Sequence, residues 1–143
     1  MKTEYEVKTF DYLPDEAMKI RITVFVDEQG FCDELDDTDK VSTHIVLYDN
    51  GKAISTCRVF EYNENGVYAL GRLCVLKDYR SKGIGSRMLK EAEQCVFELG
   101  GKELILHSQY HARGFYEKSG YDEYGEPEYE QDCPHIWMKK ALL

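Results

Sequence analysis

Residues 73–96, LCVLKDYRSKGIGSRMLKEAEQCV, join an apolar strand to an amphipathic helix through a basic turn that contains two glycines. The strand ends near Leu76, and Gly100 and Gly101 stop the helix. Apolar side chains fall on one face of this helix and are expected to face the core: Ile84, Met88, Leu89, Ala92, Cys95, Val96 and Leu99. The stretch therefore predicts a strand, a glycine turn and a helix that packs on a core.

The glycine turn has the composition of an anion site. Gly83 and Gly85 lack Cβ atoms, so a ligand can approach the backbone closely. A helix that begins here presents unpaired N–H groups and its positive dipole end, and Arg80 and Lys82 add charge. The turn matches neither G-x-x-x-x-G-K-[ST] nor G-x-G-x-x-G. It predicts a diphosphate site, with a tight strand-to-helix turn that binds nothing as the alternative.

The rest of the chain supplies further elements, which follow from hydrophobic periodicity and turn residues. They are a short alternating strand at the start, a helix over 14–30, a three-strand antiparallel meander over 43–76, a strand over 102–108, a short helix over 111–120 and a final strand over 135–142. The first helix is indicated by Pro14 in its first turn and by the spacing of Ala17, Ile20, Arg21, Val24 and Phe25. This order predicts an α+β (mixed α/β) fold with a central sheet.

Composition limits the classes of function. The 143 residues fit one domain, 1–143, and 43% hydrophobic residues with three prolines are typical of a globular chain. A net charge of −9 disfavours a nucleic-acid partner. The five scattered cysteines form no C-x-x-C pair and no zinc-ligand pattern, so we expect a reduced compartment and no metal. Without a long apolar segment, we expect a cytoplasmic protein with no membrane partner.

Two segments carry a family resemblance. Residues 73–93 resemble the acetyl-CoA signature of the GNAT N-acetyltransferase superfamily, in which an apolar strand is followed by R-x-x-G-x-G and a long helix. Residues 109–121, QYHARGFYEKSGY, resemble the second GNAT signature, with an alanine three residues before Phe-Tyr and a later glycine-aromatic pair. RITVFVDEQG (21–30) and CPHIWMKK (133–140) are similar to the small bacterial ElaA-like branch. The resemblance implies a mostly antiparallel central sheet with splayed central strands flanked by helices.

The resemblance also implies an activity and a cosubstrate. It implies an acetyl-CoA-dependent N-acetyltransferase that transfers acetyl directly to a primary amine of a small molecule or protein, with acetyl-CoA in the gap between the splayed strands. The pantetheine arm would lie along Leu73, Cys74 and Val75, with a backbone N–H near Val75 polarising the thioester carbonyl. Gln109 stands where many members carry an asparagine that contacts CoA. The diphosphate would lie on the turn formed by Arg80, Ser81, Lys82, Gly83, Ile84 and Gly85.

Acid–base groups follow from the same resemblance. Tyr116 matches the tyrosine that the family places near the CoA sulfur, where it can protonate the leaving thiolate and would also contact the cofactor. The alternative for Tyr116 is a helix tyrosine with a satisfied hydroxyl. The candidates for the general base are Glu28, His44, His107 and His135. His107 and His135 are favoured because their strands should border the gap, and a water relay is the alternative.

Three charged or reactive features stay open. Arg72, inside an apolar strand, is expected either to bind an acidic substrate group or to pair with an acid such as Glu61. The acidic run DELDDTDK (33–40) is interpreted as a solvated loop, with attraction of a cationic substrate as the alternative. A covalent role for Cys74 is disfavoured because its strand should be buried and nothing nearby would lower the pKa of its thiol.

Two other functions remain as alternatives. A non-catalytic acyl-CoA-binding module would keep the phosphate turn without the transfer chemistry. An acyl-homoserine-lactone synthase-like enzyme would share a related fold, but the short chain argues against it. Dimers are frequent in the superfamily, so a homodimer is an expectation, although nothing in this sequence establishes one.

Overall fold

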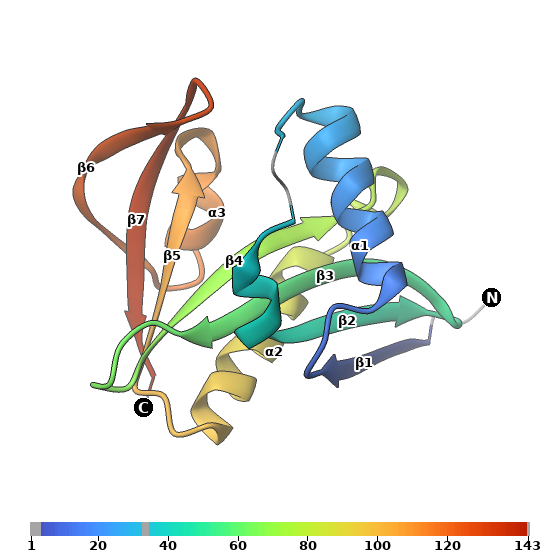
Figure 1. Cartoon of the computed structure of the whole chain (residues 1–143), viewed down its shortest axis with the longest axis horizontal. Helices are drawn as coiled ribbons and strands as arrows, with labels where there is room; N and C mark the ends of the chain where they lie inside the picture. Colours follow the sequence, from blue (N-terminus) through green and yellow to red (C-terminus); the bar gives the residue numbers. More distant parts are fainter. Residues whose placement is uncertain (1–3, 33–34, 143) are drawn as a thin grey trace.

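The computed structural model describes residues 4–32 and 35–142 and shows a central seven-stranded sheet in the order β1-β2-β3-β4-β5-β7-β6 (Figure 1). The strands are β1 (Tyr5–Phe10), β2 (Thr43–Asp49), β3 (Lys52–Glu61), β4 (Val67–Val75), β5 (Glu103–Gln109), β6 (Asp122–Glu130) and β7 (Cys133–Ala141). Only β4 and β5 pair in parallel, and the other neighbours are antiparallel. The predicted mixed fold with a mostly antiparallel central sheet is confirmed.

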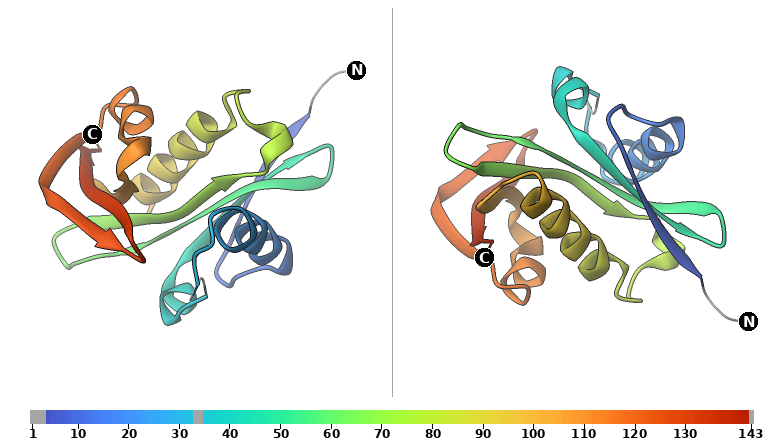
Figure 2. Two further views of the ribbon diagram at one scale, coloured as in Figure 1. Left: turned by 90° about the horizontal axis from the view of Figure 1, so that it is seen from above. Right: turned by 90° about the horizontal axis from the view of Figure 1, so that it is seen from below.

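Helices cover both faces of this sheet (Figure 2). α1 (Asp15–Arg21) lies on one face, and α2 (Ile84–Glu98) and α3 (Arg113–Glu117) lie on the other. The core under α2 contains the apolar side chains predicted for its inner face, namely Ile84, Met88, Leu89, Ala92 and Val96. Leu99 was expected on that face, but it is exposed because the helix ends at Glu98 and Leu99 caps it.

The first predicted helix has two parts with different helical geometry. α1 begins after the extended Pro14 and passes at Arg21 into a π-helical segment, η1 (Ile22–Glu28). Apolar spacing alone predicts a helix here but does not distinguish α-helical from π-helical turns. π-Helical turns are rare in proteins, and those that occur are often found at functional sites. Short 3-10 segments complete the described chain: η2 (Asp37–Val41), η3 (Lys77–Tyr79) and η4 (Tyr110–Ala112).

The central strands β4 and β5 separate after a short paired segment. They pair only over residues 67–70 and 103–106. The register between β3 and β4 shifts between Thr56 and Arg58, and Arg72 has a φ of 55°, which marks a bulge in β4. The strand therefore bends away from β5, and the two diverge upward in Figure 1. The expected splay of the central strands is confirmed.

Strand β6 was not predicted from the sequence. It is largely exposed at the edge of the sheet, carries many acidic residues and contains Pro127, beside which the register with β7 shifts between Tyr124 and Glu128. Edge strands tolerate proline and charge, so they show no alternation of apolar and polar residues. Within residues 4–32 and 35–142, no helix is long and apolar enough to cross a membrane.

Candidate active site

A cleft of about 1060 Å³ opens between the separated ends of β4 and β5. Its lining includes nearly all the residues predicted to contact the cofactor: Leu73, Cys74, Val75, Arg80, Ser81, Gly83, Ile84, Gly85, Gln109 and Tyr116. Lys82 is the exception, because it is absent from the lining and its Nζ lies 5.6 Å from the Tyr79 ring centroid. Cys74 is buried, as predicted for its strand. The splay therefore brings segments that are distant in sequence to one cleft.

The glycine turn has open space at one glycine and tight packing at the other. Gly83 caps α2 with a φ of 79°, no side chain caps the helix, and an added Cβ would meet no atom within 4 Å. The first N–H groups of α2 therefore lack a side-chain cap beside the cleft. At Gly85 an added Cβ would lie 3.1 Å from Cζ of Phe115. Gly85 therefore also packs closely against α3, a contact that the sequence did not suggest.

Arg80 connects the end of β4 to η1. Its Nε donates to the Val75 carbonyl at 2.9 Å, and its guanidinium pairs with the Glu28 carboxylate at 2.9 Å. Glu28, one of the four base candidates, is thus held in an ion pair and is not part of the cleft lining. His44 also lies outside the lining, because it is buried on β2 with its Nε2 2.9 Å from the Asp39 carbonyl. Burial lowers the pKa of His44.

Tyr116 lies on α3 and lines the cleft. Its ring contacts Phe115 and Tyr121 edge-on, with centroids 4.9 Å and 6.1 Å away. Burial raises the pKa of the Tyr116 phenol above its ordinary value, so the hydroxyl stays protonated and available as a donor. Tyr121, by contrast, donates to Oε2 of Glu93 at 2.9 Å. Of the two neighbouring tyrosines, only Tyr116 faces the cleft.

His107 and His135 lie side by side, as their predicted strands suggested. Their ring centroids are 5.0 Å apart, and both rings line the cleft. One carboxylate oxygen, Oε2 of Glu130, lies 3.5 Å from Nδ1 of His107 and 3.3 Å from Nε2 of His135. Burial lowers the pKa of His107, and nearby Glu130 partly opposes that effect. His107 is therefore neutral near pH 7.

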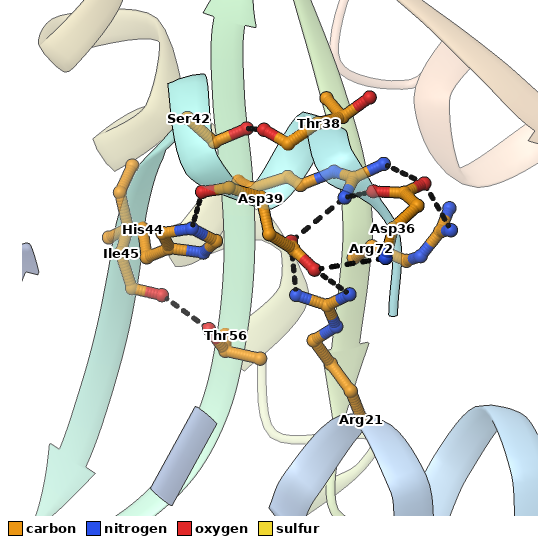
Figure 3. A network of polar contacts seen from close by, with 10 residues as sticks. Arg21, Asp36, Thr38, Asp39, Ser42, His44, Ile45, Thr56 and Arg72 are labelled. Carbon is orange, nitrogen blue, oxygen red and sulfur yellow. Dashed lines mark hydrogen bonds and ion pairs between the residues drawn. The ribbon is translucent and has the colours of Figure 1, made fainter. Parts of the chain in front are cut away.

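Arg72 pairs with an acid that the sequence did not suggest. The acid is Asp36, at 3.2 Å, and not Glu61 of the neighbouring strand. Asp36 also pairs with Arg58 at 2.6 Å, and Asp39 pairs with Arg58 at 2.8 Å. Figure 3 shows Asp39 facing Arg21, with which it pairs at 2.7 Å. Asp39 is only 7% exposed, so the interpretation of this run as a solvated loop is wrong for it. Residues 33 and 34 of the run lie outside the described residues.

Two glutamines bridge the segment after η1 to the far wall of the cleft. Gln109 donates to the side chain of Gln29 at 2.7 Å. Gln131, in the β6–β7 turn, accepts from the Cys32 amide and donates to its carbonyl, each at 2.8 Å. The sequence assigned Gln109 to CoA but missed Gln131 and Glu130, because both depend on the unrecognised β6. The signal that could have located them was their place just before CPHIWMKK.

The comparisons with known proteins agree with this geometry. The family described as acetyltransferase (GNAT) domain matches residues 6–142. The Bacillus subtilis protein "Uncharacterized N-acetyltransferase YjcF" is 36% identical over 128 residues, covering 87% of this chain and 90% of that protein. The crystal structure of Escherichia coli ElaA is 26% identical, with a TM-score of 0.81 over 97% of this chain and 99% of that chain.

A further solved structure shares the fold alone. It is an aminoglycoside 6'-N-acetyltransferase complexed with coenzyme A, 18% identical, with a TM-score of 0.75 over 96% of this chain and 97% of that chain. Since the family match spans residues 6–142, it includes the glycine turn, both cleft histidines and Tyr116. This chain therefore belongs to the GNAT acetyltransferase family.

Proposed function

We propose that the protein is an acetyl-CoA-dependent N-acetyltransferase that transfers acetyl directly to a primary amine. The observation that carries this proposal is that one cleft is lined by the glycine turn, by β4 beyond its paired segment and by Tyr116, His107 and His135. A fold that only bound acyl-CoA would need the first two features. It would need neither a protonated phenol nor a histidine pair on the same cleft.

The proposed cofactor contacts follow from the helix end at the glycine turn and from the separation of β4 from β5. The uncapped N-terminus of α2 and the open space at Gly83 suit the diphosphate of CoA. The pairing of β4 with β5 ends at Leu70, so the pantetheine arm can lie along Leu73 to Val75 on the β5 side, like an added strand. Arg80 lies at the same turn, and its charge is shared with Glu28. Acetyl-CoA would thus bind along β4 with its diphosphate at the turn.

The transfer step needs a neutral amine and a stabilised leaving group. The amine nitrogen attacks the thioester carbonyl, the C–S bond breaks, and the electron pair leaves on sulfur. Tyr116 supplies the proton that converts the thiolate to the thiol, and the proton lost by the nitrogen that became cationic on attack replaces it. The histidine pair removes the proton that makes the incoming amine cationic. Overall, an ammonium and acetyl-CoA give an amide, CoA thiol and one released proton.

The first experiment is calorimetric titration with acetyl-CoA, dephospho-CoA and pantetheine at moderate salt. We expect acetyl-CoA to bind with a dissociation constant on the order of micromolar. Pantetheine should bind ~100-fold more weakly because it lacks the diphosphate. A panel of primary amines, followed by release of CoA thiol, then tests transfer. Binding without transfer to any amine would instead identify an acyl-CoA-binding module, and no binding would refute the proposal altogether.

Tyr116→Phe should separate chemistry from binding. We expect kcat to fall ~100-fold, because general acid catalysis typically contributes about two to four orders of magnitude. The affinity for acetyl-CoA should stay within about twofold. The matched control is Tyr121→Phe, which removes a hydroxyl bonded to Glu93 outside the cleft lining. It should cost about 1 kcal/mol of stability and leave kcat unchanged. Equal kcat values for Tyr116→Phe and the wild type would remove the phenol from the mechanism.

A further inference from the structure

Four aromatic rings form a continuous row along one wall of the cleft. The ring centroids of Phe31 and His135 are 6.3 Å apart, those of His135 and His107 are 5.0 Å apart, and those of His107 and Trp137 are 4.6 Å apart. All four residues line the cleft, and they come from the segment after η1, from β5 and from β7. This aromatic row offers apolar ring faces with a negative quadrupole, which suit both a hydrophobic group and a cation.

A carboxylate stands at the histidines of this row. Glu130, at the end of β6, places Oε2 3.3 Å from Nε2 of His135 and 3.5 Å from Nδ1 of His107. Its side chain is 56% exposed and belongs to the cleft lining. In the part of the chain that the structure describes, its ion pairs within 4 Å are with these two rings alone. The carboxylate therefore faces the cleft without a lysine or arginine partner among those residues.

The two histidines and Glu130 offer more hydrogen-bond acceptors than donors to one another. Nδ1 of His135 lies 2.9 Å from the Cys133 carbonyl, which can only accept, so that nitrogen carries the proton. In the neutral ring, Nε2 then directs its lone pair toward the Glu130 carboxylate. Among residues 4–32 and 35–142, Nε2 of His107 is buried with no hydrogen-bond partner. Nε2 of His135 and Oε2 of Glu130 lie 3.3 Å apart, so a donor group beside them can bond both, and an ammonium group supplies three N–H donors.

Other charges around the cluster do not oppose a cation. Arg58 and Arg72 line the same cleft, but Asp36 lies 2.6 Å from the first and 3.2 Å from the second. Groups close enough to act electrostatically on His107 include Glu130, His135 and Glu128. Two of these three groups are carboxylates. The local field around the histidines therefore favours a positive group at this end of the cleft.

We propose that the acceptor is a primary alkylammonium with an apolar, ring-bearing body, whose ammonium binds between Glu130 and His135 and whose body lies along the aromatic row. The inference rests on the proposed acetyl transfer. Nε2 of His135 takes one proton from the ammonium, which leaves a neutral amine and an imidazolium paired with the Glu130 carboxylate. The amine then attacks the thioester, and the imidazolium later releases its proton to solvent.

A pair of acceptors with the same shape tests this role of Glu130. 2-Phenylethylamine is a cation at pH 7, whereas O-benzylhydroxylamine has the same length and ring but is neutral at that pH. For Glu130→Gln we expect kcat/KM to fall ~100-fold with the first acceptor, because the carboxylate that binds the ammonium is lost. With the second acceptor we expect a change within about threefold, because no cation has to be bound or deprotonated.

The matched control is Glu126→Gln. It removes the same charge from the same strand, where Glu126 is exposed and is not part of the cleft lining. We expect kcat/KM to change by less than about threefold with either acceptor, and acetyl-CoA to bind both variants with wild-type affinity. Equal losses with the two acceptors in Glu130→Gln would mean a structural role and would overturn the inference. Equal losses in the two variants would also overturn it.

Failure of this inference and failure of the proposed function give different results. If the wild type binds acetyl-CoA and acetylates other amines but neither of this pair, the acceptor assignment is wrong and acetyl transfer stands. If the wild type binds acetyl-CoA but acetylates no amine at all, transfer itself is refuted, and the acceptor assignment is refuted with it.

Discussion

Gly83→Leu should lower the affinity for acetyl-CoA at least ~100-fold while the protein still folds. An added Cβ at Gly83 meets no protein atom within 4 Å, so the new side chain would extend into open space in front of the uncapped N-terminus of α2. That space is where the diphosphate has to lie if the turn binds CoA. The φ of 79° adds strain, because residues with a Cβ pay roughly 1–2 kcal/mol in the left-handed region.

The chain offers a matched control at the other end of the same helix. Gly100 has a φ of 90°, and an added Cβ there also meets nothing within 4 Å. Gly100→Leu should therefore lose a similar amount of stability, measured by urea unfolding, and keep wild-type affinity in calorimetric titration. The difference between the two variants isolates the effect on the ligand from the effect on the backbone. Wild-type affinity in Gly83→Leu would show that the diphosphate binds elsewhere.

Local signals made part of this architecture predictable. The glycine turn, the amphipathic helix and the antiparallel meander depend on residues close in sequence, and the structure contains all three. The pairing of His107 with His135 was predictable because β5 and β7 are adjacent strands, and Gln109 lies opposite His135 in their register. Gly85 shows the limit of such reasoning, since it packs against Phe115 on α3, a segment distant in the sequence.

Contacts between distant segments were not predictable in the same way. Glu130 reaches the histidines from an edge strand whose acidic, proline-containing sequence resembles a loop. The ion pair of Asp36 with Arg58 depends on the course of a chain segment that carries no periodic pattern. A charge run looks the same in sequence whether its side chains face solvent or buried guanidinium groups. Only the tertiary fold distinguishes the two.

The acidic run yields the largest expected loss of stability. Asp39→Asn should lower the free energy of unfolding by about 3–5 kcal/mol, because it leaves buried arginine charge without its carboxylate. Arg21 is 1% exposed and donates to both oxygens of Asp39, at 2.7 Å and 3.1 Å, and Arg58 is 5% exposed and donates at 2.8 Å. The neutral amide of asparagine has one acceptor oxygen where the carboxylate has two, so it loses the bond from Nη2 of Arg21 and the negative charge that both guanidinium groups face. Urea unfolding at pH 7 measures the loss.

The control for this variant lies two residues earlier. The side chain of Asp37 is 97% exposed and pairs only with Lys40 in the described chain, so Asp37→Asn should change the free energy of unfolding by less than about 0.5 kcal/mol. Both variants remove one negative charge from the same short helix, η2. Similar losses in the two would mean that the charge of the segment matters and that the buried pairing does not.

The pH dependence of stability gives a second readout of the same pairing. Burial alone would raise the pKa of Asp39, but hydrogen bonds from Arg21 and Arg58 outweigh it and lower the pKa from 3.8 to about 2. The folded state therefore binds the proton of this carboxyl less tightly than the unfolded state. The resulting stability is fully present above about pH 4 and is lost as the pH falls through about 2. In Asp39→Asn this part of the acid-induced loss should disappear, whereas Asp37→Asn should retain it. Because Arg58 also lines the cleft, its pairing with Asp39 helps to fix one wall of the site, so acetyl-CoA affinity should fall together with stability in Asp39→Asn.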